Sequence, residues 1–251
     1  MYRISQQEPS PGFKKAWQAA GRHIQQYGQG GVHWIRANLN PPLAEHLSFR
    51  IGNQLLFIFV EAEEYAFNSG KDLFLKVAKE AGAIPCVLPM AEHLTEYSPI
   101  ESGWGLLHAE TGKNVNPLAL VSTDLIEVSN WELHDFAIQT VKSNLEQEGK
   151  NIFSAHSSLH IDPSIWFEES GKVYWVVVRA VRYPERDANI PTNINAIKKS
   201  CAQVGKSGYF ASVTIANADD PFDPEASENG NFLPVYRGHG MYPHFSGLTA
   251  V

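Results

Sequence analysis

The chain has 251 residues, of which 43% are hydrophobic and 19% are charged, and its formal net charge is −7. These values are typical of a soluble globular protein, and no apolar run reaches the roughly 18–20 residues that a membrane-spanning helix needs. The N-terminus lacks the apolar segment of a secretory signal, so we expect a cytoplasmic protein without membrane contact.

The first half of the chain is expected to begin with a helix and a β-hairpin. A serine followed by a proline predicts the start of the helix at residue 10, and a glycine predicts its end at residue 28. The hairpin is predicted over residues 47–62, because the Gly52-Asn53 pair can form its tight turn. Its second strand is apolar on both faces over residues 55–60, as is typical of a central strand covered on both sides.

A helix over residues 71–81 and a strand over residues 84–90 follow the hairpin. A strand, a helix and a second strand in this order predict a right-handed crossover and parallel pairing of the two strands. Residues 91–128 are interpreted as a connector with hairpin character.

The clearest helix start in the chain lies at Ser129. Glu132 stands three residues further on, and this spacing is typical of a capping box, in which each side chain bonds the backbone of the other residue. The helix is predicted to run from Trp131 to about Glu148 and to end at Gly149.

The second half then repeats the order of elements of the first. We expect a strand over residues 162–167, a turn at Ser170-Gly171 and a strand over residues 173–182. A helix is predicted from residue 191 to residue 205, followed by a strand over residues 209–216.

An internal repeat is indicated by the two apolar strands, because residues 55–65 align with residues 173–183 without a gap. Val60, Ala62 and Tyr65 are identical to Val178, Ala180 and Tyr183. The sequence therefore predicts an α+β protein made of two similar helix-hairpin-helix-strand units with mixed sheets, divided into residues 1–128 and 129–251 or merged in one compact domain.

The order helix, strand, strand, helix, strand, with an aspartate at the start of the hairpin, resembles the core of the restriction-endonuclease-like, PD-(D/E)XK, superfamily over roughly residues 131–216. In that family an Asp begins one strand, and a Glu and a Lys two residues apart lie on one face of the next, where the acids hold a divalent ion that activates water. Asp162-Pro163 matches the first part, and the Glu-x-Lys position falls on Val177-Val178-Arg179. Arg179 could replace the lysine as a cation, whereas Val177 cannot bind a metal.

The first unit differs from the family's motif in the opposite way, because it has the acids and lacks the lysine. Glu61 and Glu63 lie two residues apart on one strand face and Glu45 precedes the hairpin, so three carboxylates could hold Mg²⁺, but no lysine completes the set. We therefore expect a nuclease-like scaffold that binds a partner without catalysis and needs no cofactor. The alternative is a nuclease or phosphodiesterase that depends on Mg²⁺ or another divalent metal.

Two further groups of residues are candidates for a binding site. His156 and His160 would share one face only in a helix, and a loop is expected there, so we expect no metal at these histidines. Arg237, His239 and His244 stand among glycines that could let the backbone approach a ligand, or that simply mark an irregular C-terminal loop.

Charge is spread unevenly along the chain. Residues 91–149 hold ten acids and two bases, whereas residues 150–217 hold eight bases and five acids. Such a division predicts pairing with an unknown protein partner or with a second copy of the chain, and the overall negative charge makes nucleic acid an unfavourable partner. Cys86 and Cys201 lie in apolar segments and are interpreted as reduced core thiols.

Overall fold

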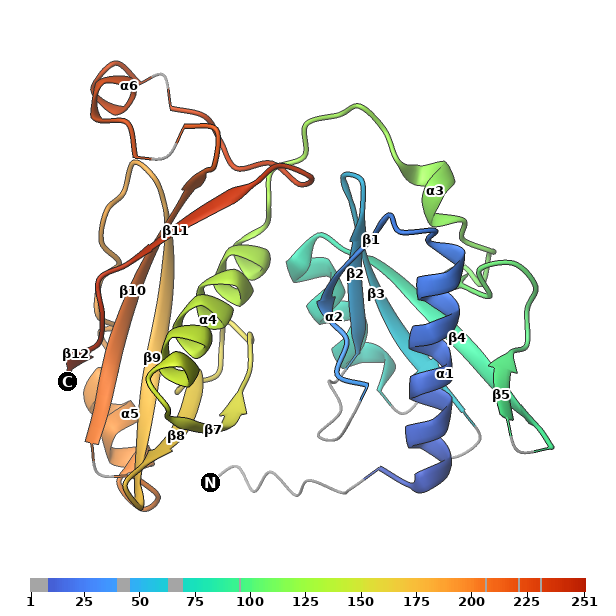
Figure 1. Cartoon of the computed structure of the whole chain (residues 1–251), viewed down its shortest axis with the longest axis horizontal. Coiled ribbons are helices and arrows are strands. Elements are labelled where there is room, and N and C mark those ends of the chain that lie inside the picture. The colour runs from blue at the N-terminus through green and yellow to red at the C-terminus, as the bar shows by residue number, and fades with distance from the viewer. Residues whose placement is uncertain are drawn as a thin grey trace. The chain divides into compact units, whose positions relative to one another are not determined.

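The structure is a computed structural model, and it describes residues 9–39, 46–62, 70–94, 96–205, 207–220, 222–230 and 232–251. The chain forms two compact units that divide between Ile126 and Glu127. Each unit combines helices with one mixed β-sheet, as the predicted α+β class requires (Figure 1). Within the described ranges, no helix is both long and apolar enough to cross a membrane.

The first unit has strand order β1-β2-β3-β4-β5, with β6 also paired to β4. Only the β3–β4 pair is parallel. Its elements are α1 (Pro11–Tyr27), β1 (Val32–Arg36), β2 (Leu47–Ile51), β3 (Gln54–Glu61), α2 (Lys71–Ala81), β4 (Ile84–His93), β5 (Glu96–Pro99), β6 (Leu107–His108) and α3 (Pro117–Leu120).

The second unit has strand order β7-β8-β9-β10-β11, with β12 also paired to β10, and only the β9–β10 pair is parallel. Strand order and strand directions are therefore the same in both sheets. Its elements are α4 (Asn130–Gln147), β7 (Asn151–Ala155), β8 (Ile165–Glu169), β9 (Lys172–Arg182), α5 (Ile194–Cys201), β10 (Ser207–Asn217), α6 (Pro224–Glu228), β11 (Met241–Phe245) and β12 (Thr249–Ala250).

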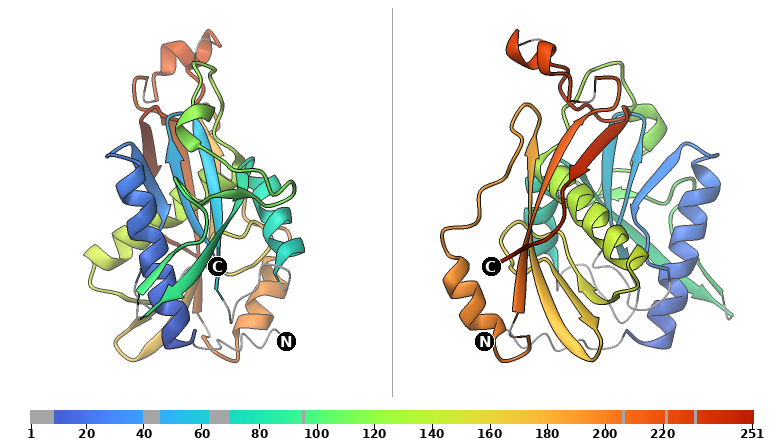
Figure 2. Two further views of the ribbon diagram at one scale, coloured as in Figure 1. Left: turned by 90° about the vertical axis from the view of Figure 1, so that its right-hand side faces the viewer. Right: turned by 60° about the vertical axis from the view of Figure 1, so that its left-hand side comes forward.

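Each sheet has one helix packed on each of its two faces, α1 and α2 in the first unit and α4 and α5 in the second (Figure 2). In the second unit, Val176 and Val178 of β9 face the core beneath α4, whereas Trp175 and Val177 face the core beneath α5. Residue side chains alternate between the faces of a strand, so a strand covered on both sides must be apolar at successive positions. The prediction of a central strand over residues 55–60 is thus confirmed, and the strand predicted over residues 173–182 is central in the second sheet.

Most local predictions are confirmed by the structure. The capping box at Ser129 is complete, because its side chain accepts from the Glu132 N–H at 3.2 Å and its own N–H donates to Glu132 Oε2 at 2.8 Å. Gly82 ends α2 in the left-handed conformation. The β8–β9 turn places both Ser170 and Gly171 at positive φ, as a two-residue hairpin requires.

Three predictions need correction. Each sheet has an additional antiparallel edge strand before the hairpin, β1 and β7, so the units are not simple helix-hairpin-helix-strand repeats. Strand β8 begins at Ile165 rather than at residue 162, and Pro163 cannot donate a ladder hydrogen bond. Helix α5 spans only Ile194–Cys201, which is shorter than the predicted 191–205.

On the face of the second sheet that α5 covers, the backbone of one strand packs closely against an indole ring of the next. Gly208 lies opposite Trp175 in the β9–β10 register, and a Cβ added there would stand 2.1 Å from the ring. The indole N–H of Trp175 also donates to Gly205 O at 3.1 Å, which limits its movement.

We expect Gly208→Ala to lower the free energy of unfolding by about 1–3 kcal/mol, because overpacking forces the indole from its site. Ser207→Ala, at the exposed neighbouring position, is the matched control and should leave the thermal midpoint near that of the wild type. Equal midpoints for the two variants would contradict the close packing described here. Thermal denaturation of both proteins makes the comparison.

Candidate functional site

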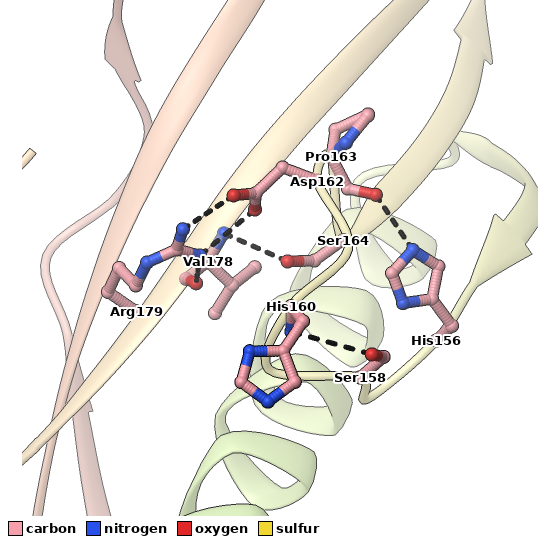
Figure 3. A network of polar contacts seen from close by, with 8 residues as sticks. All are labelled: His156, Ser158, His160, Asp162, Pro163, Ser164, Val178 and Arg179. Atoms are coloured by element: carbon pink, nitrogen blue, oxygen red, sulfur yellow. Dashed lines mark hydrogen bonds and ion pairs between the residues drawn. The ribbon is translucent and has the colours of Figure 1, made fainter. Parts of the chain in front are cut away.

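The loop that precedes β8 is held against β9 by hydrogen bonds of Ser164, whose Oγ accepts from the N–H of Val178 at 3.3 Å (Figure 3). The N–H of Ser164 donates to Val176 O at 2.9 Å, and its carbonyl accepts from the N–H of His156 at 3.1 Å. The ring of His156 lies 2.9 Å from Pro163 O through Nε2, which must be the donor because a carbonyl only accepts. This packing places Asp162 directly beside β9.

Asp162 and Arg179 form a bidentate ion pair. The two guanidinium nitrogens donate to the two carboxylate oxygens at 3.0 and 2.6 Å, and Nη1 also donates to Val178 O at 2.8 Å. The side chains are 13% and 27% exposed, respectively, so the pair is partly shielded from water. A planar guanidinium matches a carboxylate in this geometry, and both candidates from the sequence are therefore brought together as partners of each other.

The position expected for the second acid lies in an apolar environment. Val177 is fully buried and packs in the cluster that contains Trp175, Ile197, Cys201 and Phe210. Burial, and to a smaller degree the charge of the Asp162 carboxylate, raises the pKa of the Cys201 thiol to about 11. Neither the Val177 side chain nor the protonated Cys201 thiol therefore offers a charged ligand near Asp162.

A divalent ion does not fit the donor set at Asp162. Both oxygens of its carboxylate accept from a guanidinium, and Val177 has no donor atom. In the part of the chain that the structure describes, no three His, Cys, Asp or Glu side chains are grouped so that they could hold a metal ion.

The two candidate histidines of this loop have separate roles. His156 contacts Pro163 O, whereas His160 is exposed and its backbone N–H donates to Ser158 Oγ at 3.4 Å (Figure 3). The segment is a loop, as expected, so their spacing of four residues does not place both rings on one helix face.

The C-terminal candidates do not form one site. Arg237 is buried and donates to the carboxylate of Glu132 from Nε at 3.1 and 3.0 Å and from Nη2 at 2.9 Å. His244 lies on β11 and contacts Phe222 edge to face at 5.8 Å, whereas the exposed His239 contacts Tyr236 at 6.0 Å. Arg237 is thus part of the core of its unit rather than a free ligand-binding cation.

The acidic candidates of the first unit can be placed only in part. Glu61 is the last residue of β3, is half-buried and stands in register with Pro89 of β4. Glu45 and Glu63 lie outside the described residues. A cluster of these three carboxylates therefore stays a prediction.

A pocket of about 380 Å³ lies beside the C-terminal part of β9, next to the Asp162–Arg179 pair. Helix α4, the loop before β8 and the turn after β9 all contribute to it. Its lining residues are Asn130, Leu133, His134, Leu159, Arg179, Ala180, Val181, Arg182 and Glu185. Sequence reasoning identified Arg179 alone among them, because the others meet only through the packing of α4 on the sheet.

The expected division of charge is weaker at the surface than the residue counts indicate. Glu132 and Asp135 belong to the acidic stretch 91–149, yet both are buried in the second unit. Glu132 pairs with Arg237, and Asp135 accepts a hydrogen bond from Ser157 Oγ. These two acids contribute to internal stability rather than to an exposed acidic face.

Comparison with known proteins relates the second unit to one family. The family, described as a domain of unknown function (DUF8840), matches residues 131–251, which run from the first turn of α4 to the end of the chain. The match covers slightly less than half of the chain and leaves the first unit outside it. No curated protein and no solved structure shows a significant similarity.

Proposed function

We propose that this chain is a non-catalytic binding protein whose two units are copies of one nuclease-like unit and whose partner is another protein. The observation that carries the proposal is the Asp162–Arg179 ion pair. The single acid at the place where the resemblance implies a metal ligand is neutralised by a guanidinium at 2.6 and 3.0 Å. Val177 occupies the place of the second acid and lies in the core.

The duplication is supported by the sheets. Both have the same strand order and the same single parallel pair, and in each unit one helix precedes the first strand and another connects the two parallel strands. Strands β3 and β9, which carry the sequence repeat, occupy the same central position in each sheet. Duplication of one ancestral unit would explain why the two sheets agree in strand order and direction.

The nuclease-like character is supported by the relation between the second unit and the family's motif. Asp162 lies three residues before the start of β8 and pairs with Arg179 on β9, so the positions that the resemblance implies for the first acid and the basic residue are adjacent. The second unit differs from the motif at Val177, which stands where the family has its second acid. A unit that keeps the scaffold, has one acid already paired with Arg179 and lacks the second acid is best explained by a role in binding.

The alternative, a divalent-metal nuclease or phosphodiesterase, is tested by incubating supercoiled plasmid with the full chain in Mg²⁺ or Mn²⁺. We expect no nicking above the level of a buffer control. Asp162→Asn is the diagnostic variant, because asparagine keeps an acceptor for Arg179 while it removes the charge. Nicking by the wild type that disappears in Asp162→Asn or in Glu61→Gln would overturn the proposal, whereas nicking that persists in both variants would indicate a contaminating nuclease.

A further inference from the structure

We propose that the open edge of β9 at Ala180 and Arg182 binds an extended peptide segment of a partner protein by strand addition. The inference rests on the proposed binding function and names the class of partner and the place where it binds. It depends on the backbone of β9, on the pocket beside it and on the residues that form the pocket walls.

Strand β9 is longer than its neighbour β8. The antiparallel ladder ends at the Ile165–Val176 pair, but β9 continues to Arg182. Over the end of this stretch β9 pairs with β10, up to the Ile215–Arg182 pair, and the described residues place no strand on its other side. The C-terminal part of β9 therefore has one open edge, although β9 is the central strand of the sheet.

Hydrogen bonds show which residues of β9 face this edge. Val176 O and the N–H of Val178 bond Ser164, on the β8 side, whereas the N–H of Tyr183 donates to Ile215 O of β10 at 3.0 Å. Backbone groups of successive strand residues point alternately to the two sides. Ala180 and Arg182 therefore direct their backbone groups toward the open edge.

The carbonyl of Arg182 accepts from the N–H of Glu185 at 2.9 Å in the following turn. An incoming chain could thus bond the N–H and C=O of Ala180 and the N–H of Arg182. These three groups are spaced as in a strand, so an extended backbone matches them and a compact small molecule does not.

The pocket beside the edge has room for the side chains of such a segment. Residues 179–182 line it along about 10 Å, the length of three residue steps in a strand. Leu133 of α4 and Leu159 of the loop before β8 supply an apolar wall. An apolar side chain of the peptide would pack mainly against Leu159, because Leu133 is itself only 2% exposed.

The polar residues of the pocket do not favour a peptide with a strong net charge of either sign. Arg182 donates from its guanidinium to Asn130 Oδ1 and to Val128 O, each at 2.6 Å, and the described residues include no carboxylate paired with it. Glu185 lines the same pocket and offsets this positive charge. Main-chain pairing and the apolar wall would therefore determine which peptides bind.

Amide hydrogen exchange of the full-length protein tests the open edge directly. The amide of Ala180 should exchange about 100-fold faster than that of Val181, because only Val181 donates within the β9–β10 ladder. Equal protection of the two amides would show that the edge is covered in the free protein and would overturn the proposal.

Peptide binding is tested with a displayed library of random twelve-residue peptides, followed by affinity measurement of one selected synthetic peptide. Ala180→Pro removes the N–H at the edge without removing a bond to β10, and it should weaken binding at least about tenfold. Ala155→Pro is the matched control: its neighbour His156 bonds Ser164 O, so Ala155 directs its N–H away from the sheet, and binding should be retained.

Leu159→Asp provides a second variant that leaves the strand intact and should also weaken binding about tenfold. The inference fails if no peptide is selected above background, or if the selected peptides bind Ala180→Pro and Leu159→Asp as tightly as the wild type. The plasmid assay separates the two proposals, since failed peptide binding without nicking rejects only the strand addition, whereas specific nicking rejects the non-catalytic function.

Discussion

Replacing Glu132 with alanine is expected to lower the free energy of unfolding by about 3–5 kcal/mol. The carboxylate accepts three hydrogen bonds from Arg237 and one from the backbone N–H of Ser129. The side chains of Glu132 and Arg237 are only 4% and 5% exposed. Alanine would remove the Glu132 carboxylate from a buried guanidinium, and this loss is large because water cannot reach the site to replace the carboxylate.

Glu132→Gln separates the two roles of this side chain. Glutamine can still accept from the Ser129 N–H and so preserves the helix cap, but it cannot neutralise Arg237. Its destabilisation should therefore lie between those of the wild type and Glu132→Ala. The matched control on the same helix is Glu146→Ala, which removes an exposed pair with Lys142 and should change the stability by no more than about 0.5 kcal/mol.

Urea denaturation of the four proteins makes these comparisons. If Glu132→Ala unfolds at the same urea concentration as Glu146→Ala, the buried pair does not contribute as the structure implies. Loss of the pair would also release the C-terminal segment from α4, so we expect faster amide exchange at residues 236–238 in Glu132→Ala.

Acidification is expected to destabilise the first unit through His46. This imidazole is buried, stacks on Phe57 with ring centroids 4.1 Å apart and meets Phe74 edge to face. Burial, and secondly the positive charge of Arg36, lowers the pKa of His46 from 6.5 to about 3. The folded protein therefore keeps the ring neutral at pH values where the unfolded chain binds a proton.

The direction of the pH dependence follows from this difference. Stability from the neutral ring is fully present above pH 6.5 and is lost as the pH falls toward 3, at about 1.4 kcal/mol per pH unit, because only the unfolded state takes up the proton. Integrated over the whole interval, the loss approaches 5 kcal/mol. His46→Phe, which keeps an aromatic ring against Phe57, should remove this part of the pH dependence.

The measurement is the free energy of unfolding in urea at steps between pH 7.5 and 4. Carboxylates titrate in the same range, so the informative quantity is the difference between the wild type and His46→Phe at each pH. That difference should shift in favour of the variant as the pH falls. Parallel curves would reject the assignment, and His46→Leu serves to show that the change in slope follows from the loss of the imidazole.

Features that depend on neighbouring residues could be predicted from the sequence. The capping box involves Ser129 and Glu132, three positions apart, and the hairpin turn at Ser170-Gly171 depends on the two residues that adopt positive φ. Parallel pairing of β9 with β10 followed from a helix between two apolar strands. In each case the interacting groups are close in the chain, or the handedness of the crossover leaves a single arrangement.

The edge strands could not be predicted in the same way. Strands β1 and β7 have five residues each and are only partly buried, so their sequences lack the continuous apolar run that identifies β3 and β9. An edge strand is held by hydrogen bonds on one side and needs few buried side chains. Its position therefore depends on the strand that it pairs with, which the local sequence does not contain.

The candidate site was decided by tertiary structure. The sequence identified both Asp162 and Arg179 as candidates. It did not show that they form an ion pair with each other, because the pair depends on the packing of the loop before β8 against β9. Glu132 was recognised as a helix cap, and its buried partner Arg237 stands 105 residues further along the chain. Side chains so far apart in sequence meet only when helix and sheet pack together, so the sequence by itself determined the elements and their order, whereas packing determined which charges are neutralised and which edge of β9 stays open.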